Sequence, residues 1–364
     1  MDNKQLACRG ALWGFAIGDA MGYAVDDKTW PEILETYGPN GLLGYDVVNE
    51  RAEVTSYTQV MAYIANAMLV ALGRGKGDAY LRFGTAGLRQ WAKRQHFPRD
   101  PEPTALWVSR MSELRRRRLK DPRMLDALRF ETLGTLAKPI NRAASCGTLS
   151  TAVALGAFYE QGRMTPDQLM DLTADLAALT HGHPEAVFAS VTLAYIIAAL
   201  RQVPDRPLQQ QIEKAVDVMQ ARYGDRFPVR VVAEPVRQAI ALAEGPRQDP
   251  QTVMEMLECR TAAQVLAGAV YASLRYQDDF DGALICAVNH SGASCAVGAV
   301  TGAILGVIQG ADTLPEFYLE GLDCVPILTE LADDMTRGTV TAGLFDADWD
   351  QKYVQAIPLL PMQE

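Results

Sequence analysis

Residues 186–200 read AVFASVTLAYIIAAL, and residues 296–309 read AVGAVTGAILGVIQ. In both stretches apolar residues recur at three- and four-residue intervals, which predicts helices. Both are also dense in alanine or glycine, and small residues permit close contact between helices. We therefore expect two central helices crowded on all sides, around which distant segments of the chain meet at one site.

Helical periodicity continues through most of the chain, at residues 59–72, 149–160, 165–179, 208–222, 231–243 and 262–276. Two helix starts are legible, because Thr165 precedes Pro166 and His183 precedes Pro184. The only strand candidate is residues 227–232, against which Pro228 counts. The four arginines at 115–118 are interpreted as a solvated helix face. The pattern predicts an all-α domain over residues 1–340, with residues 341–364 as an extension packed on or beside it.

The net charge and the cysteine content limit the functions that the protein can have. The 364 residues carry a formal net charge of -10, which argues against nucleic acid as a partner but is compatible with a small anionic ligand. Six cysteines without a C-x-x-C pair predict reduced, mostly buried thiols. No signal peptide and no stretch long and apolar enough to span a bilayer are recognised. We expect a cytoplasmic protein without a membrane partner, and the oligomeric state stays open.

Four segments carry a resemblance to a known family. Residues 9–22 read RGALWGFAIGDAMG, residues 52–60 read AEVTSYTQV, residues 141–151 read NRAASCGTLST and continue to THGHP at 180–184, and residues 287–299 read AVNHSGASCAVGA. Together they resemble the ADP-ribosylglycohydrolase family, whose patterns include G-D-A-x-G, T-D-D-T-Q, T-H-x-H-P and N-H-S-G-D-S-D. The resemblance implies a single large orthogonal helical domain that hydrolyses a glycosidic bond to ADP-ribose with two Mg²⁺ or Mn²⁺ ions.

The resemblance also implies where the site lies and what it has lost. The four aspartates that bind metal in the family align with Ser56, Tyr57, Ala293 and Cys295, so both ions are expected to be absent and no cofactor is predicted. The general base position holds Asp26 in place of a glutamate. The remaining matches imply a ligand-binding set made of Asp19, Thr55, Thr58, Asn141, Cys146, Gly147, His181, Gly182, His183, Ser291 and Gly292.

Three functions stay open on these residues. The first is a pseudoenzyme that binds ADP-ribose or an ADP-ribosylated protein without cleaving it. The second is a hydrolase with altered, metal-independent chemistry, for which Cys295 at a helix start and His290 as its base are candidates alongside Asp26. The third is a purely structural or interaction protein. Tyr57 is large enough to fill the pocket itself, in which case even ADP-ribose binding would fail.

Overall fold

The computed structural model describes residues 2–47, 51–96, 106–337 and 346–354. This part of the chain is mainly helical. Seventeen α-helices and no strand occur there, as the sequence predicts. The helices are α1 (Asn3–Tyr23), α2 (Trp30–Tyr37), α3 (Ser56–Gly73), α4 (Tyr80–His96), α5 (Pro122–Ala127), α6 (Gly147–Phe158), α7 (Pro166–Ala178), α8 (Pro184–Gln202), α9 (Leu208–Tyr223), α10 (Arg230–Glu244), α11 (Pro250–Met256), α12 (Ala262–Arg275), α13 (Phe280–Val288), α14 (Ser294–Gln309), α15 (Glu316–Glu320), α16 (Val325–Arg337) and α17 (Ala347–Trp349). Short 3-10 turns lie at Gly77–Ala79, Trp107–Arg110 and Ser112–Leu114, and a π-helical turn at Asp350–Val354.

The helix starts follow their local signals. The Thr165 hydroxyl caps α7 by accepting from the Gln168 amide, and the His183 ring caps α8 by accepting from the Glu185 amide. Residues 227–232, the one strand candidate, form no strand: Phe227 and Val229 lie in a turn, and α10 begins at Arg230. A helix forms from Arg230 onward because the apolar residues from Val232 to Ile240 are spaced so that one face of α10 is buried.

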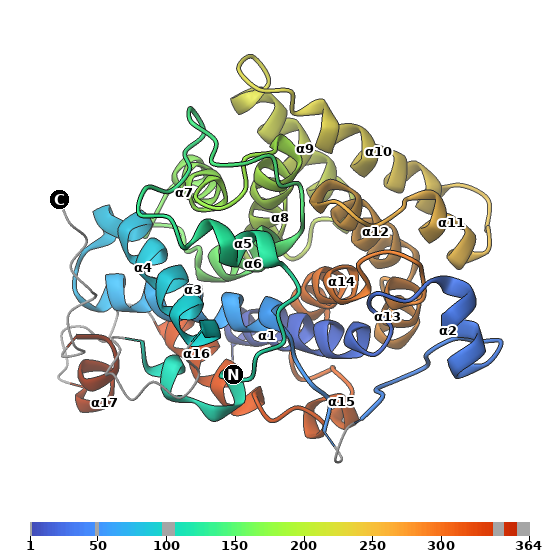
Figure 1. The fold of residues 1–364 in the computed structure, drawn as a ribbon, viewed down its shortest axis with the longest axis horizontal. Helices are drawn as coiled ribbons and strands as arrows, with labels where there is room; N and C mark the ends of the chain where they lie inside the picture. The colour runs from blue at the N-terminus through green and yellow to red at the C-terminus, as the bar shows by residue number, and fades with distance from the viewer. Residues whose placement is uncertain (1, 48–50, 97–105, 338–345, 355–364) are drawn as a thin grey trace.

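Helices α1 and α14 form the closest contact in the middle of the molecule (Figure 1). Glycines face each other along both helices in the order Gly10–Gly306, Gly14–Gly302 and Gly18–Gly298, so the helices are antiparallel. A Cβ atom added at Gly14 would lie 2.0 Å from the Gly302 carbonyl oxygen. Only glycine permits this approach, which brings the end of α1 beside the start of α14.

Helix α8 corrects one expectation from the sequence. It is long and apolar enough to cross a bilayer by length and composition. However, 78% of its most apolar 18-residue window is buried inside the protein. It packs against α6, α7, α9 and α12, and these contacts account for its composition as that of a core helix.

The described part of the predicted C-terminal extension, residues 346–354, packs against α3 and α16. The Tyr353 side chain is buried, and its hydroxyl donates to Asp334 Oδ2 at 2.6 Å. A Cβ atom at Gly73 would lie 2.8 Å from the Cβ of Tyr353, which shows how closely the extension approaches α3. The rest of the predicted extension, 341–345 and 355–364, lies outside the described residues.

Candidate functional site

A buried carboxylate on α1 organises the start of α3. Asp19 is fully buried and accepts four hydrogen bonds, from the amides and hydroxyls of Thr55 and Thr58, at 2.7 to 3.3 Å. Burial outweighs these hydrogen bonds and raises the pKa of the Asp19 carboxyl to about 6. Three predicted ligand-binding residues, Asp19, Thr55 and Thr58, therefore lie together, and they satisfy one another.

A second carboxylate, Asp26, joins the end of α1 to the start of α14. Its Oδ1 accepts from the Cys295 amide at 2.9 Å, and its Oδ2 pairs with the Lys120 ammonium at 2.8 Å. Lys120 also pairs with Asp27 at 2.8 Å and lies 5.2 Å from the Tyr23 ring centroid. Burial opposes the charge on Lys120, but the aspartates prevail and its pKa is raised. Asp26 is thus held by a cation that the protein itself supplies.

Lys120 follows the four arginines at 115–118. These arginines were predicted to form a solvated helix face, and the structure shows that they do not form a helix. Residues 115–120 are irregular, because their backbone bonds to α3 instead of to itself. The Arg118 carbonyl accepts from the Ser56 amide at 2.9 Å, and the Lys120 amide donates to the Ser56 hydroxyl at 3.0 Å. The guanidinium groups of Arg116 and Arg118 bind Glu53. Ser56, which aligns with one of the family's metal-binding aspartates, therefore anchors this segment.

Asp121 organises the start of α6. Its Oδ2 accepts from the Gly147 amide at 2.8 Å and lies 3.0 Å from His181 Nε2. That ring nitrogen is also 3.0 Å from the Ser145 hydroxyl. Burial alone would raise the pKa of the Asp121 carboxyl, but the His181 ring and the Gly147 amide lower it to about 2. The Asp121 carboxylate thus accepts the hydrogen bond of the Gly147 amide, a backbone donor that the family resemblance assigns to a ligand.

Tyr57 lies between these groups. Its side chain is buried, with 6% of the residue exposed, and its hydroxyl donates to Cys146 Sγ at 3.9 Å. Burial raises the Tyr57 pKa well above its usual value, and charges on Cys146, Asp121, Asp26 and Cys295 add to the effect. Its ring therefore fills the space between the starts of α3, α6 and α14.

Three further predicted residues, Asn141, Gly182 and His183, lie at the loop before α8. Asn141 Oδ1 accepts from the Gly182 amide at 3.0 Å, and Asn141 Nδ2 donates to the Thr180 carbonyl at 2.8 Å. Gly182 has no room for a side chain, since a Cβ would lie 2.0 Å from the Asn141 carbonyl oxygen. His183 is half-buried and caps α8, so its ring has a structural role there.

The loop before α14 holds the remaining predicted residues. The His290 ring accepts from the Gly292 amide at 2.9 Å and meets the Ala287 carbonyl at 2.8 Å, so both nitrogens are engaged. Burial lowers the His290 pKa to about 4. The Ser291 hydroxyl accepts from the Trp30 amide at 2.8 Å. Cys295 is fully buried, and burial, followed by Asp26 and Asp19, raises its pKa well above the usual value.

The sequence-based site omitted Lys120 and Asp121, which are central to it. A signal existed for Asp121, because an aspartate before Pro122 is typical of a helix N-cap, and it does cap α5. No local pattern marks Lys120, whose importance comes from contacts with Asp26 and Asp27, 94 and 93 residues away in the chain.

The residues at the four aligned metal positions do not fit a pair of divalent cations. Ser56, Tyr57, Ala293 and Cys295 offer a hydroxyl, a buried phenol, a methyl group and a protonated thiol, whereas Mg²⁺ and Mn²⁺ prefer carboxylates and water. The nearby carboxylates are already bonded to protein donors. In the described residues, no three His, Cys, Asp or Glu side chains are grouped as a metal site.

The fold and site together define an all-α domain in which several helix starts converge on a buried polar centre. The family model for ADP-ribosylglycohydrolases matches residues 2–344. The chain therefore belongs to the ADP-ribosylglycohydrolase family, which confirms the resemblance in the sequence.

A solved structure described as an ADP-ribosylglycohydrolase-related protein complex has the same fold. It shares 24% identity with this chain at a TM-score of 0.53, and the match covers 93% of this chain and 99% of that one. Among curated protein sequences, no relative was found.

Proposed function

We propose that this chain is a non-hydrolytic member of its family, a pseudoenzyme that acts by binding. The observation that carries the proposal is the Tyr57 ring, buried between α3, α6 and α14 at a position where the family resemblance implies a metal-binding aspartate. Lys120 adds to the case, because its ammonium already neutralises Asp26. A bulky phenol and an internal cation together replace the acidic lining on which the family's chemistry depends.

Electrostatics argues against hydrolysis assisted by two metal ions. Two divalent ions would bring about four positive charges to a centre that already contains the Lys120 ammonium. Leaving such charge unpaired in the interior costs several kcal/mol per ion. Without those ions, the side chains at Ser56, Tyr57 and Ala293 have no means of activating a water molecule.

We propose ADP-ribose, free or attached to a protein, as the ligand, bound without metal. The N-terminus of α6, taken by itself, favours an anionic ligand. However, the Gly147 amide is bonded to Asp121, and the Tyr57 ring occupies the adjacent space. Binding therefore requires these groups to move, and we expect it to be weak in the native chain.

Calorimetry with ADP-ribose, with and without Mg²⁺, tests this proposal. We expect the same weak binding in both conditions and no release of ADP-ribose from modified arginine or serine peptides. Tyr57→Ala should tighten binding, because it empties the occluded space, whereas Tyr57→Phe keeps the ring and serves as the matched control. Binding that strictly requires Mg²⁺, or metal-dependent release of ADP-ribose, would refute the proposal.

The other two functions make different predictions in the same experiments. Cysteine chemistry is disfavoured, since His290 uses both ring nitrogens on the backbone and Cys295 is buried with a raised pKa. A cysteine-based hydrolase would release ADP-ribose from modified peptides, and alkylation of Cys295 would abolish that release. A purely structural protein would bind no ADP-ribose even as the Tyr57→Ala variant.

A further inference from the structure

Two adjacent carboxylates after α1 converge on one ammonium group. Lys120 Nζ lies 2.8 Å from Asp26 Oδ2 and 2.8 Å from Asp27 Oδ2. The Asp26 amide still bonds to the Gly22 carbonyl, as in a helical turn, and consecutive side chains on such a turn do not face each other. Asp27, however, has a φ of 69°, in the left-handed region that aspartate tolerates better than most residues. This change of direction lets both carboxylates reach the same cation.

The ammonium group has the surroundings of a bound cation. The Tyr23 ring centroid lies 5.2 Å from Lys120 Nζ, which is within the distance of a cation–π contact. The side chains of Lys120 and Asp26 are little exposed, whereas that of Asp27 faces solvent. Two carboxylates and an aromatic ring therefore hold a positive charge at a place that stays open to solvent on the Asp27 side.

This cation is joined to both halves of the aligned metal site. On the α3 side, the Ser56 hydroxyl accepts from the Lys120 amide at 3.0 Å. On the α14 side, the other oxygen of Asp26 accepts from the Cys295 amide at 2.9 Å. Ser56 and Cys295 align with two of the family's metal-binding aspartates, and neither side chain is a carboxylate. One ammonium group thus connects two segments that the family resemblance connects through metal ions.

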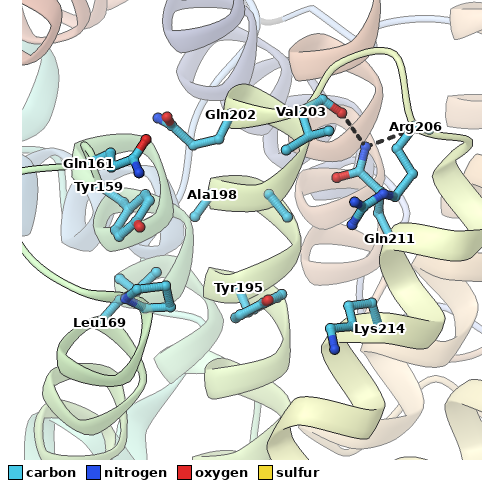
Figure 2. Close-up of a pocket in the computed structure, with 12 residues that line it drawn as sticks. Tyr159, Gln161, Leu169, Tyr195, Ala198, Gln202, Val203, Arg206, Gln211 and Lys214 are labelled. Atoms are coloured by element: carbon cyan, nitrogen blue, oxygen red, sulfur yellow. Dashed lines mark hydrogen bonds between the residues drawn. The ribbon is translucent and has the colours of Figure 1, made fainter.

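Lys214 provides the contrast to Lys120. It lies with Arg206 at a pocket between α7, α8 and α9 (Figure 2), where its side chain is exposed and forms no ion pair with a described residue. Loss of such a surface charge has little effect on stability. Loss of the Lys120 ammonium would instead leave two neighbouring carboxylates without their shared cation.

We propose that Lys120 is a tethered replacement for a metal ion. Its ammonium group occupies a cation site formed by Asp26, Asp27 and Tyr23, and it holds the starts of α3 and α14 together without an ion from solution. Removal of the side chain should leave a site that takes up a small cation. The inference rests on the proposed function for its biological meaning, namely binding without metal. Its test contains no ADP-ribose, so a failure of this cation site and a failure of ligand binding are distinguishable.

Chemical rescue of Lys120→Ala tests the cation site, with Tm as the measurement. We expect this variant to melt roughly 5 °C below the native chain, because the two carboxylates lose their cation. Propylammonium contains the atoms that the substitution removes, and at about 50 mM it should raise the Tm of the variant by about 2 °C and leave the native chain unchanged. Tetramethylammonium has the same charge but no N–H donor, so it should have no comparable effect. Mn²⁺, which prefers carboxylate ligands, should stabilise Lys120→Ala and not the native chain.

Lys214→Ala is the matched control, since it removes an exposed lysine without an ion pair. It should melt within about 1 °C of the native chain and show no response to propylammonium. If Lys120→Ala does not fold alone, the yield of folded protein on dilution from urea gives the same comparison between the two ammonium ions. The proposal is overturned if propylammonium stabilises all three proteins alike, or if it helps Lys120→Ala no more than tetramethylammonium does. Equal effects of Mn²⁺ on the native chain and on Lys120→Ala would also overturn it.

Discussion

Lys120 and Asp26 form an ion pair with little exposure, 11% and 8% of their side chains. Lys120→Met would leave the Asp26 carboxylate without its cation, and an unpaired charge in such a position is strongly destabilising. We expect a loss of about 3 kcal/mol in the free energy of unfolding, measured by urea titration.

The double variant Asp26→Asn/Lys120→Met provides the control for this pair. It removes both charges, and the substituted asparagine side chain would retain an oxygen that accepts from the Cys295 amide. We expect part of the lost stability to return. A double variant no more stable than Lys120→Met would contradict an ion pair between these two side chains.

Asp19 should make the stability of the protein depend on pH. Its pKa is about 6 in the folded state and about 3.9 in an unfolded chain, so the folded protein binds the proton more tightly between these values. Stability from this group is fully present below pH 3.9 and is lost as the pH rises through 6. Relative to Asp19→Asn, the native chain should lose about 2 kcal/mol between pH 4 and pH 7.

Chemical denaturation of both proteins at several pH values measures this difference directly. Groups other than Asp19 titrate in both proteins and largely cancel in the comparison. A difference that stays constant with pH would mean that the four hydrogen bonds from Thr55 and Thr58 offset the burial of the carboxylate completely.

At the scale of helices, the contact between α1 and α14 determines where the site forms. Asp26 reaches the Cys295 amide because the end of α1 lies against the start of α14. This registration depends on glycine, since the backbones touch where Gly14 meets Gly302. The site is consequently sensitive to a single methyl group far from its chemistry.

Gly302→Ala should destabilise the protein by at least about 3 kcal/mol, because its Cβ would lie 2.0 Å from the Gly14 carbonyl oxygen and the helices must separate. Gly44→Ala is the matched control, since no atom lies within 4 Å of a Cβ there. We expect that variant to stay within about 0.5 kcal/mol of the native chain. Similar denaturation midpoints for the two variants would argue against the close helix contact.

For the whole molecule, burial controls the reactivity of every cysteine. All six, including Cys146 and Cys295, are free and buried. Cys295 follows the first residue of α14, where a helix N-terminus ordinarily favours a thiolate. Burial dominates instead and raises its pKa, so position at a helix start is not enough to activate it.

Iodoacetamide at pH 7.5 should therefore modify no cysteine of the folded protein within minutes and all six in urea, as counted by intact mass. The unfolded sample is the internal control, because it contains the same thiols without burial. Rapid modification of Cys295 alone in the folded protein would contradict its burial and revive the cysteine-based alternative.

Local sequence was sufficient for the helices and for the family. The periodicity of 186–200 and 296–309, and the caps at Thr165 and His183, depend on neighbours within one or two turns, so α7, α8 and α14 were predictable. The same local rule failed at residues 115–118, where bonds to the start of α3 produce an irregular segment in place of a helix.

Only the tertiary structure decided what fills the site. The sequence by itself determined that the four aligned metal positions hold Ser56, Tyr57, Ala293 and Cys295, since residue identity needs no coordinates. That Tyr57 is buried against Cys146 and that Lys120 neutralises Asp26 depends on segments about 90 residues apart meeting in space. Such pairings depend on how the helices pack together, and the spacing of apolar residues within one segment does not predict them.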